Sequence, residues 1–208
     1  MGNVIPFLVK AVLLAPPILL AIILHEIAHG VVAYRLGDDT AKVAGRLTLN
    51  PIPHIDPIGT IALPLMLTFI GSPFLFGWAK PVPVNFRRLP NPKRDMIAVA
   101  AAGPGTNIAL ALLSAVAAHV FNALGSHWLT AMAVISVQFN VVLAVFNLLP
   151  ILPLDGGRVL FGLLPREPAI AFARLEPYGM LIVMALLFTG TLSAILGPVA
   201  SFMIRTLL

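Results

Sequence analysis

The 208-residue sequence contains no cysteine. It therefore has no disulfides and no thiolate ligands, so any bound metal must be held by His, Asp, Glu or Asn. Charged residues are also scarce, at 10% of the chain against about 25% in a soluble domain, while 59% of the chain is hydrophobic. This balance excludes an ordinary soluble domain and indicates an integral membrane protein. Its length predicts a single domain, residues 1–208.

The formal net charge of +5 does not indicate a nucleic-acid-binding protein. The basic residues are scattered through the loops between apolar segments, which is typical of membrane topology rather than of phosphate binding. We therefore expect the chain to contact a lipid bilayer and no nucleic acid.

Five long apolar stretches predict an all-α polytopic membrane protein with about four to five transmembrane helices. Four are long enough to cross about 30 Å of hydrocarbon. The fifth contains Pro64 and the helix-breaking triplet Gly71-Ser72-Pro73, so its pieces are too short to span alone. This pattern favours a re-entrant segment, which enters the membrane and returns to the same side. The stretches are 4–34, 59–79 (the interrupted one), 96–121, 128–150 and 178–204, the last being a C-terminal helix.

The positions of the basic residues favour the re-entrant arrangement. If 59–79 does not cross, every Lys and Arg except Lys10 and Arg205 lies on one side of the membrane. If it does cross, the basic residues of the 35–58 loop change sides and the asymmetry weakens. The positive-inside rule favours the first arrangement, with four crossings and both termini outside the cytoplasm.

The polar segment 35–58 carries a run with strand-like composition from Lys42 to Leu49, followed by Asn50-Pro51-Ile52-Pro53. This pattern predicts a short β element near 42–49 at the membrane surface.

Two histidines and a glutamate stand inside the first apolar stretch, as His25-Glu26-Ile27-Ala28-His29. On a helix, His25 and His29 lie one turn apart on one face, so both imidazoles can bind one Zn²⁺, with Glu26 as general base for a zinc-bound water. The alternative is a chance match, with both histidines bonded to backbone carbonyls. The membrane setting weighs against chance because unpaired ionisable groups are costly in hydrocarbon. We expect this stretch to be retained, since cleaving it as a signal peptide would delete the motif.

A catalytic zinc needs a third protein ligand, and the best candidate is Asp155, in Pro153-Leu154-Asp155-Gly156-Gly157-Arg158. The two glycines allow close approach that a side chain would block. The alternative is an Asp that caps a following short helix. Asp155 shares a membrane depth with His25 and His29 only if the first helix and the 128–150 helix run parallel, which requires that 59–79 not cross.

Four other polar residues are candidates for roles near the metal. His54 and Asp56 could supply a ligand or orient an imidazole, or else only dock the local turn. Asn140 and Asn147 are seven residues apart and face the same way on the 128–150 helix. Asn147 could donate to a developing oxyanion or to the substrate backbone, or it could hold helices together.

These motifs together resemble the site-2 protease family of intramembrane zinc metalloproteases. The resemblance rests on the HExxH at 25–29, on Gly103-Pro104-Gly105-Thr106-Asn107, and on Phe146-Asn147-Leu148-Leu149-Pro150 leading into Leu154-Asp155-Gly156-Gly157. The segments 50–57 and 77–85 are similar to a compact bacterial and archaeal branch without PDZ or CBS domains. The family core covers about 11–160.

The resemblance implies that His25, His29 and Asp155 bind one Zn²⁺ per chain, that Glu26 is the catalytic base, and that Asn147 matches an active-site asparagine. The implied reaction is hydrolysis of peptide bonds in or near the transmembrane segments of membrane proteins. The implied location is a prokaryotic cell membrane. The distribution of basic residues places the active site towards the cytoplasm.

Three questions stay open in the sequence. A helical substrate hides its carbonyls, so an extended substrate could pair with 42–49 or with 81–85. The alternative function is a cation transporter or metal-binding membrane protein that uses the same His/Asp cluster. The sequence does not determine the oligomeric state.

Overall fold

The computed structural model describes residues 4–71 and 77–208. Within these residues the regular elements are all helical, which confirms the predicted fold class. Three helices are long and apolar enough to cross a membrane: α1 (Val4–Arg35), α4 (Pro92–Ala123) and α5 (His127–Asn147). They coincide with three of the predicted stretches.

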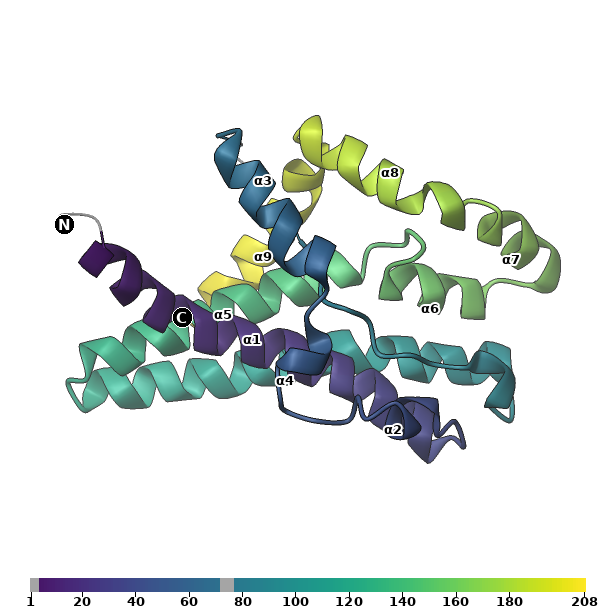
Figure 1. The fold of residues 1–208 in the computed structure, drawn as a ribbon, viewed down its shortest axis with the longest axis horizontal. Helices are drawn as coiled ribbons and strands as arrows, with labels where there is room; N and C mark the ends of the chain where they lie inside the picture. Colours follow the sequence, from purple (N-terminus) through teal and green to yellow (C-terminus); the bar gives the residue numbers. More distant parts are fainter. Residues whose placement is uncertain (1–3, 72–76) are drawn as a thin grey trace.

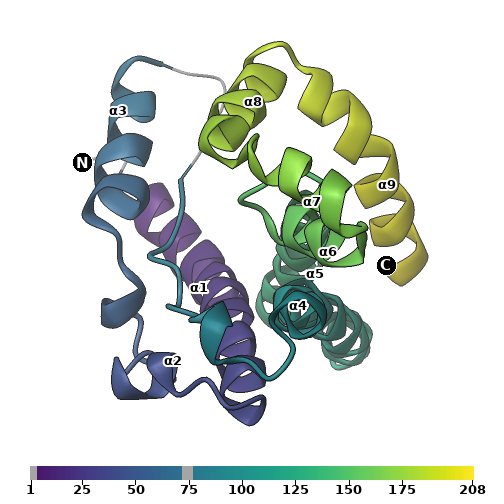
Figure 2. The same ribbon diagram turned by 90° about the vertical axis from the view of Figure 1, so that its right-hand side faces the viewer.

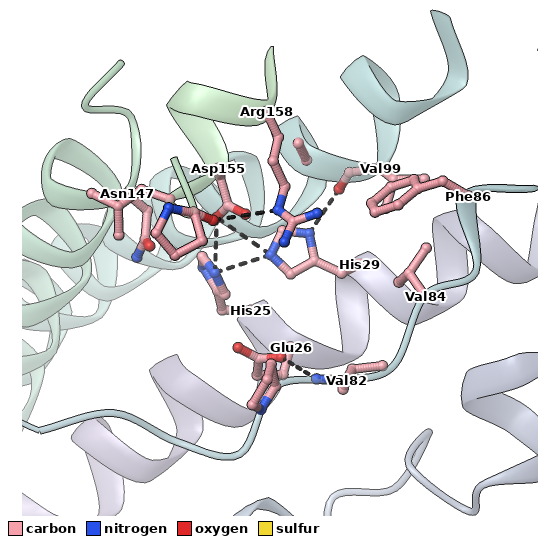
Figure 3. A pocket seen from close by; sticks show the side chains of 14 residues that line it. His25, Glu26, His29, Val82, Val84, Phe86, Val99, Asn147, Asp155 and Arg158 are labelled. Carbon is pink, nitrogen blue, oxygen red and sulfur yellow. Dashed lines mark hydrogen bonds and ion pairs between the residues drawn. The ribbon is translucent and has the colours of Figure 1, made fainter. Parts of the chain in front are cut away.

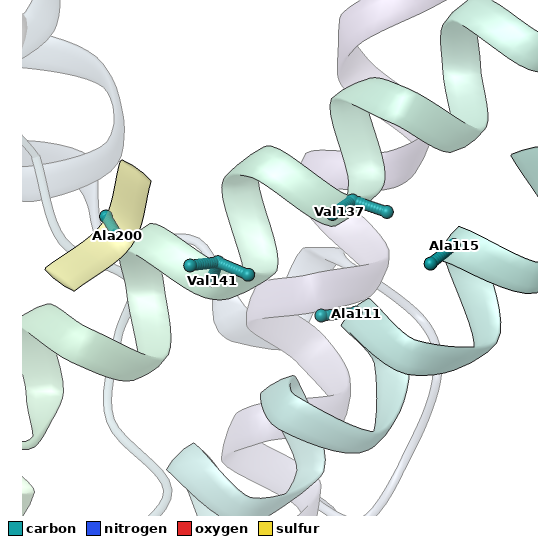
Figure 4. Packing of buried hydrophobic residues seen from close by; sticks show 5 residues of the cluster. All are labelled: Ala111, Ala115, Val137, Val141 and Ala200. Atoms are coloured by element: carbon teal, nitrogen blue, oxygen red, sulfur yellow. The ribbon is translucent and has the colours of Figure 1, made fainter. Parts of the chain in front are cut away.

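These three helices form the central bundle. In Figure 1, α1 and α5 run in the same direction and α4 runs in the opposite direction, and each of the three packs against the other two. Small residues of α4, Ala111 and Ala115, pack against Val137 and Val141 of α5 (Figure 4), so the two backbones approach closely. The parallel course of α1 and α5 brings the end of α5 to the level of the HExxH motif.

The prediction of one C-terminal helix over 178–204 is wrong. The chain forms α8 (Glu176–Phe188) and α9 (Thr191–Leu207), separated at Gly190, whose φ of +74° is a left-handed conformation that ends a helix. Two further short helices precede them, α6 (Asp155–Leu163) and α7 (Arg166–Ala173).

The number of candidate spans consequently lies at or below the lower end of the predicted four to five. With 13 and 17 residues, α8 and α9 are each short for a crossing of about 30 Å. The pair α7 and α8 passes as one span only with a bend of 64° between them. The described chain thus has three candidate spans, or four with this pair, rather than four to five.

The predicted β element near 42–49 is also wrong. This region contains the short helix α2 (Thr40–Val43), and Gly45 follows with a φ of +65°. The Thr48 hydroxyl then accepts from the Asn50 amide, a local turn that competes with strand pairing. Leu49 is 66% exposed, and no strand in residues 4–71 or 77–208 covers it. The composition resembled a strand, but the described residues provide no second strand to pair with it.

The 59–79 stretch begins with two joined helical pieces, η2 (Pro57–Ala62) and α3 (Leu63–Phe69). The α3 helix stands away from the central bundle (Figure 2). Residues 72–76, which include most of the predicted breaking triplet, lie outside the described residues. On the returning side, the Trp78 amide donates to the Gly59 carbonyl at 3.1 Å, and the Thr60 hydroxyl donates to the Trp78 carbonyl at 2.9 Å. The chain therefore leaves and returns at one place.

Two short 3-10 helices complete the described chain. They are η1 (Ile52–His54) and η3 (Phe86–Arg88). Between 77 and 85 the chain has no regular structure and passes along α1 beside the HExxH motif.

Candidate metal centre

His25 and His29 lie on α1, and both side chains are buried among α1, α4 and α6. The Nδ1 atom of His25 lies 2.6 Å from the Asn107 side-chain oxygen, and Nδ1 of His29 lies 2.7 Å from the Val99 carbonyl oxygen. Both partners are acceptors, so each Nδ1 is assigned the ring hydrogen. In the neutral imidazoles each Nε2 therefore carries a lone pair, which is the form that binds metals.

The orientation of the Asn107 amide is itself fixed. Its nitrogen donates to the Ala21 carbonyl at 3.2 Å and to the Asn140 side-chain oxygen at 2.8 Å. The amide oxygen must then face His25, and the His25 tautomer follows from it.

Asp155 completes a triangle of electron-rich atoms. Its Oδ2 lies 3.2 Å from the Nε2 of His25 and 3.3 Å from that of His29, and the two Nε2 atoms are 3.1 Å apart (Figure 3). Buried Oδ2 accepts no hydrogen bond from any described residue. Three lone-pair-bearing atoms that face one another without a donor can together hold a cation.

These distances fit a tetrahedral metal. With ligand distances of about 2.0–2.2 Å, neighbouring ligand atoms of a tetrahedral zinc site are about 3.3–3.6 Å apart. The observed separations of 3.1–3.3 Å lie close to that range. Within the described parts of the chain, this is the one group of three His, Asp or Glu side chains placed to hold a metal ion.

Asp155 does not act as a helix cap. It is the first residue of α6, and no side-chain hydrogen bond caps that helix. Its Oδ2 points instead towards His25 and His29, and a carboxylate oxygen is a group that can bind a metal.

Glycines give the three side chains of this cluster their room. A Cβ at Gly103 of α4 would lie closer than 3.0 Å to both His25 and His29. A Cβ at Gly156 would collide with the Leu148 backbone, and one at Gly157 with that of Ile151. The expected close approach at the two glycines after Asp155 is confirmed, and it sets α6 against the end of α5.

A cavity of about 290 Å³ adjoins the cluster. Glu26 lines it, and its Oε2 accepts a hydrogen bond of 2.7 Å from the Val82 amide. Asn147 and Arg158 also line this cavity, together with apolar side chains such as Phe86. A glutamate side chain, a cluster that could hold a metal ion and a partly apolar wall thus meet at one cavity.

Known proteins similar to this chain agree with the geometry. The sequence model of peptidase family M50 matches residues 119–190 of this chain. The chain is 41% identical over 182 residues to "Putative zinc metalloprotease YwhC" of Bacillus subtilis, across 84% of this chain and 80% of that protein. The chain belongs to peptidase family M50.

Two further relatives are proteins named "Putative zinc metalloprotease Rip2". The Mycolicibacterium smegmatis protein is 33% identical over 181 residues, and the Mycobacterium tuberculosis protein is 30% identical over 176 residues. Each alignment covers 84% of this M50 chain and 66% of the relative. No solved structure matches this chain significantly. The resemblance to site-2 proteases is thereby confirmed: this M50 protein is a metalloprotease, and a transporter is not favoured.

The other predicted site residues of this M50 protease are placed differently. His54 is buried, and its Nε2 lies 3.0 Å from the Thr48 carbonyl oxygen, so it docks the local turn. Asp56 accepts from the Ile58 and Gly59 amides at the start of η2. Neither belongs to the metal-binding group. Asn140 reaches the site only through Asn107.

Sequence reasoning missed several groups at the M50 site. The imidazole-orienting role considered for His54 and Asp56 falls to Asn107 and to the Val99 carbonyl. The sequence contains one indication of the role of Asn107: it lies four residues after Gly103, so the two residues share a helix face. The Val99 carbonyl and the Val82 amide are backbone groups, so the residue types at these positions do not indicate their roles.

Proposed function

We propose that this metalloprotease hydrolyses peptide bonds in or near the transmembrane segments of membrane proteins. One Zn²⁺ ion is held by His25, His29 and Asp155, and Glu26 is the general base. The observation that carries the proposal is the position of the cluster. Its two histidines lie on one candidate membrane span, α1, and hydrogen-bond to residues of a second, α4. A peptide bond that reaches this cavity comes from a chain at the same depth.

The three ligands bind through defined atoms. His25 and His29 would bind the ion through Nε2, because each Nδ1 is engaged, and Asp155 through Oδ2, which has no other described partner. When bound, Zn²⁺ supplies a Lewis acid that polarises a carbonyl and makes water easier to deprotonate.

Glu26 moves the proton. Its Oε2 is held by the Val82 amide, and we assign proton transfer to its other oxygen, Oε1. In this position Glu26 accepts a proton from the attacking water, retains it on the carboxylate, and releases it to the leaving amine.

Asn147 binds the substrate carbonyl in this proposal. Its side-chain nitrogen donates to the Leu143 carbonyl at 3.0 Å, which fixes the amide at the cavity wall. An amide nitrogen carries two hydrogens, so one can be directed at a developing oxyanion or at the substrate backbone.

The segment 59–79 re-enters rather than crosses. Support comes from the hydrogen bond between Trp78 and Gly59, which holds the two ends of the excursion together. With this topology the basic loops and the metal-binding cluster share the cytoplasmic side, and residues 1–208 act as one unit in a prokaryotic cell membrane.

Two variants test the proposal in protein reconstituted with model transmembrane substrates. For Glu26→Gln we expect one zinc per chain, as in wild type, and a turnover lower by about 10²- to 10⁴-fold, the usual contribution of a general base. For Asp155→Ala we expect loss of tight zinc binding. Wild-type cleavage by zinc-loaded Glu26→Gln would refute the base assignment. Metal transport without peptide cleavage would support the transporter instead.

A further inference from the structure

Residues 80–85, which we call the strap, run beside Glu26 without regular structure. The Val82 amide of the strap donates a hydrogen bond of 2.7 Å to Oε2 of Glu26, the proposed base. Among the described residues this is the one hydrogen bond between the strap and Glu26. A glutamate side chain has several rotatable bonds, so the orientation of Glu26 depends on where this amide is held.

A buried arginine holds the first end of the strap. Arg46 is 6% exposed, and its Nη2 donates to the Lys80 carbonyl at 2.6 Å. The Lys80 amide donates in turn to the His54 carbonyl at 2.9 Å. Burying a guanidinium is costly. A buried arginine that donates to one strap carbonyl therefore indicates that this end of the strap is held in a fixed position.

A buried aspartate holds the other end. Asp38 is fully buried, and its Oδ2 accepts from the Asn85 amide at 2.6 Å. Its other oxygen, Oδ1, accepts from the amide and the hydroxyl of Thr40. Both oxygens are therefore engaged, and the carboxylate ties the strap to the chain just beyond α1.

The strap between these ends is stiff and tightly seated. Pro81 and Pro83 flank Val82 and fix φ on both sides of it. On α1, one turn after Glu26, Gly30 leaves room for the strap, because a Cβ there would lie 3.0 Å from the Val82 side chain and 2.5 Å from that of Leu47. The Val82 amide is thus directed at Glu26 by covalent stiffness and by packing.

We infer that Arg46 and Asp38 are positioning residues of the protease, which clamp the strap at its two ends so that the Val82 amide fixes the Glu26 carboxylate beside the metal-binding cluster. This inference rests on the proposed role of Glu26 as base. It also assigns the strap a different task from pairing with substrate. Pro81 and Pro83 have no amide hydrogen, and that of Val82 is already used, so residues 81–83 offer no donor to an extended peptide.

The test compares Arg46→Ala and Asp38→Ala with matched controls from the same region. Lys42 is exposed and Asp39 is half exposed, so Lys42→Ala and Asp39→Ala remove like charges without touching the strap. Kinetics on a reconstituted transmembrane substrate and zinc per chain are measured for each protein, and zinc content reports on the metal site independently of activity. Arg46→Lys is the conservative variant, because an ammonium can still donate to one carbonyl.

We expect Arg46→Ala and Asp38→Ala to lower kcat on the order of 10- to 100-fold, as for a catalytic group displaced by about 1 Å, with KM and zinc content unchanged. Arg46→Lys should recover part of kcat, and both controls should match wild type. Wild-type kcat in both clamp variants, beside an inactive Glu26→Gln, overturns the clamp while the base assignment stands. A rise in KM with kcat unchanged assigns the strap to substrate binding and overturns the inference, as does a loss of zinc. An active, zinc-loaded Glu26→Gln instead refutes the proposed function.

Discussion

His25 Nδ1 and Asn107 Oδ1 lie 2.6 Å apart at the buried centre of the helix bundle. Because the Asn107 nitrogen is engaged by the Ala21 carbonyl and by Asn140, the amide has one orientation, and it presents an acceptor to the imidazole. A residue on α4 thereby determines which nitrogen of a histidine on α1 faces the metal position.

Replacing Asn107 with alanine should weaken metal binding. The variant removes the acceptor that fixes the ring and tautomer of His25, and loss of such partners costs about 10- to 100-fold in metal affinity. Competition with a zinc chelator measures the effect. Asn122→Ala is the control, because Asn122 is an exposed residue of the same helix, and its affinity should equal that of wild type. Equal affinity in Asn107→Ala would show that the His25 ring is fixed by other contacts.

A matched pair of glycines on α4 tests the space around the ligands. Gly103→Ala would place a methyl group closer than 3.0 Å to both His25 and His29, the proposed zinc ligands, so we expect loss of stoichiometric zinc. At Gly105 a Cβ meets nothing within 4 Å, so Gly105→Ala should keep the zinc and gain about 0.5–1 kcal/mol of helix stability. Zinc analysis and thermal unfolding of the two purified variants measure both effects. Full zinc occupancy in Gly103→Ala would contradict the observed packing.

The main lines of the site could be predicted because they follow regular geometry. The helical period places His25 and His29 on one face, and the topology implied by the basic loops brings the chain after α5 back to their depth. Asp155 is found there, 3.2 Å from His25. Both expectations depend on positions along helices, which a sequence pattern specifies well.

The rest depends on contacts that a pattern does not specify. The strand-like composition near 42–49 gave no information on whether a second strand would pair with it. The break at Gly190 lies within an apolar run whose composition suits one helix. The group that holds Glu26 is the backbone amide of Val82. Every residue except proline has such an amide, so only the path of the strap shows its contact with Glu26.

Asp38 should give the fold a pH-dependent contribution to stability. Burial acts to raise its pKa, but hydrogen bonds from Thr40 and the Asn85 amide outweigh burial and hold the pKa below its ordinary value. A carboxyl whose pKa is lower in the folded than in the unfolded state stabilises the fold above the unfolded pKa, and this contribution disappears as the pH falls through the folded pKa.

Thermal unfolding of wild type and Asp38→Asn in detergent between pH 7 and pH 3 measures this contribution. The stability advantage of wild type should be complete at neutral pH and should decline once the pH falls below about 4, the ordinary aspartate value. Asp39→Asn is the control, because that carboxyl is about half exposed in its pair with Arg88 and such pairs contribute little. An advantage for wild type that does not vary with pH would mean that Asp38 acts through packing rather than charge.

The absence of cysteine makes the topology directly measurable, since any introduced thiol is unique. Lys42→Cys in α2 and Arg87→Cys in η3 are exposed positions before and after the 59–79 stretch, and Asn122→Cys stands at the far end of α4. If 59–79 re-enters, a membrane-impermeant thiol reagent should label Lys42→Cys and Arg87→Cys from the cytoplasmic side and Asn122→Cys from the other. If the stretch crosses, Lys42→Cys should instead be labelled together with Asn122→Cys. The second pattern would be incompatible with the hydrogen bond that joins Trp78 to Gly59, because the two ends of the excursion would then lie on opposite faces of the bilayer.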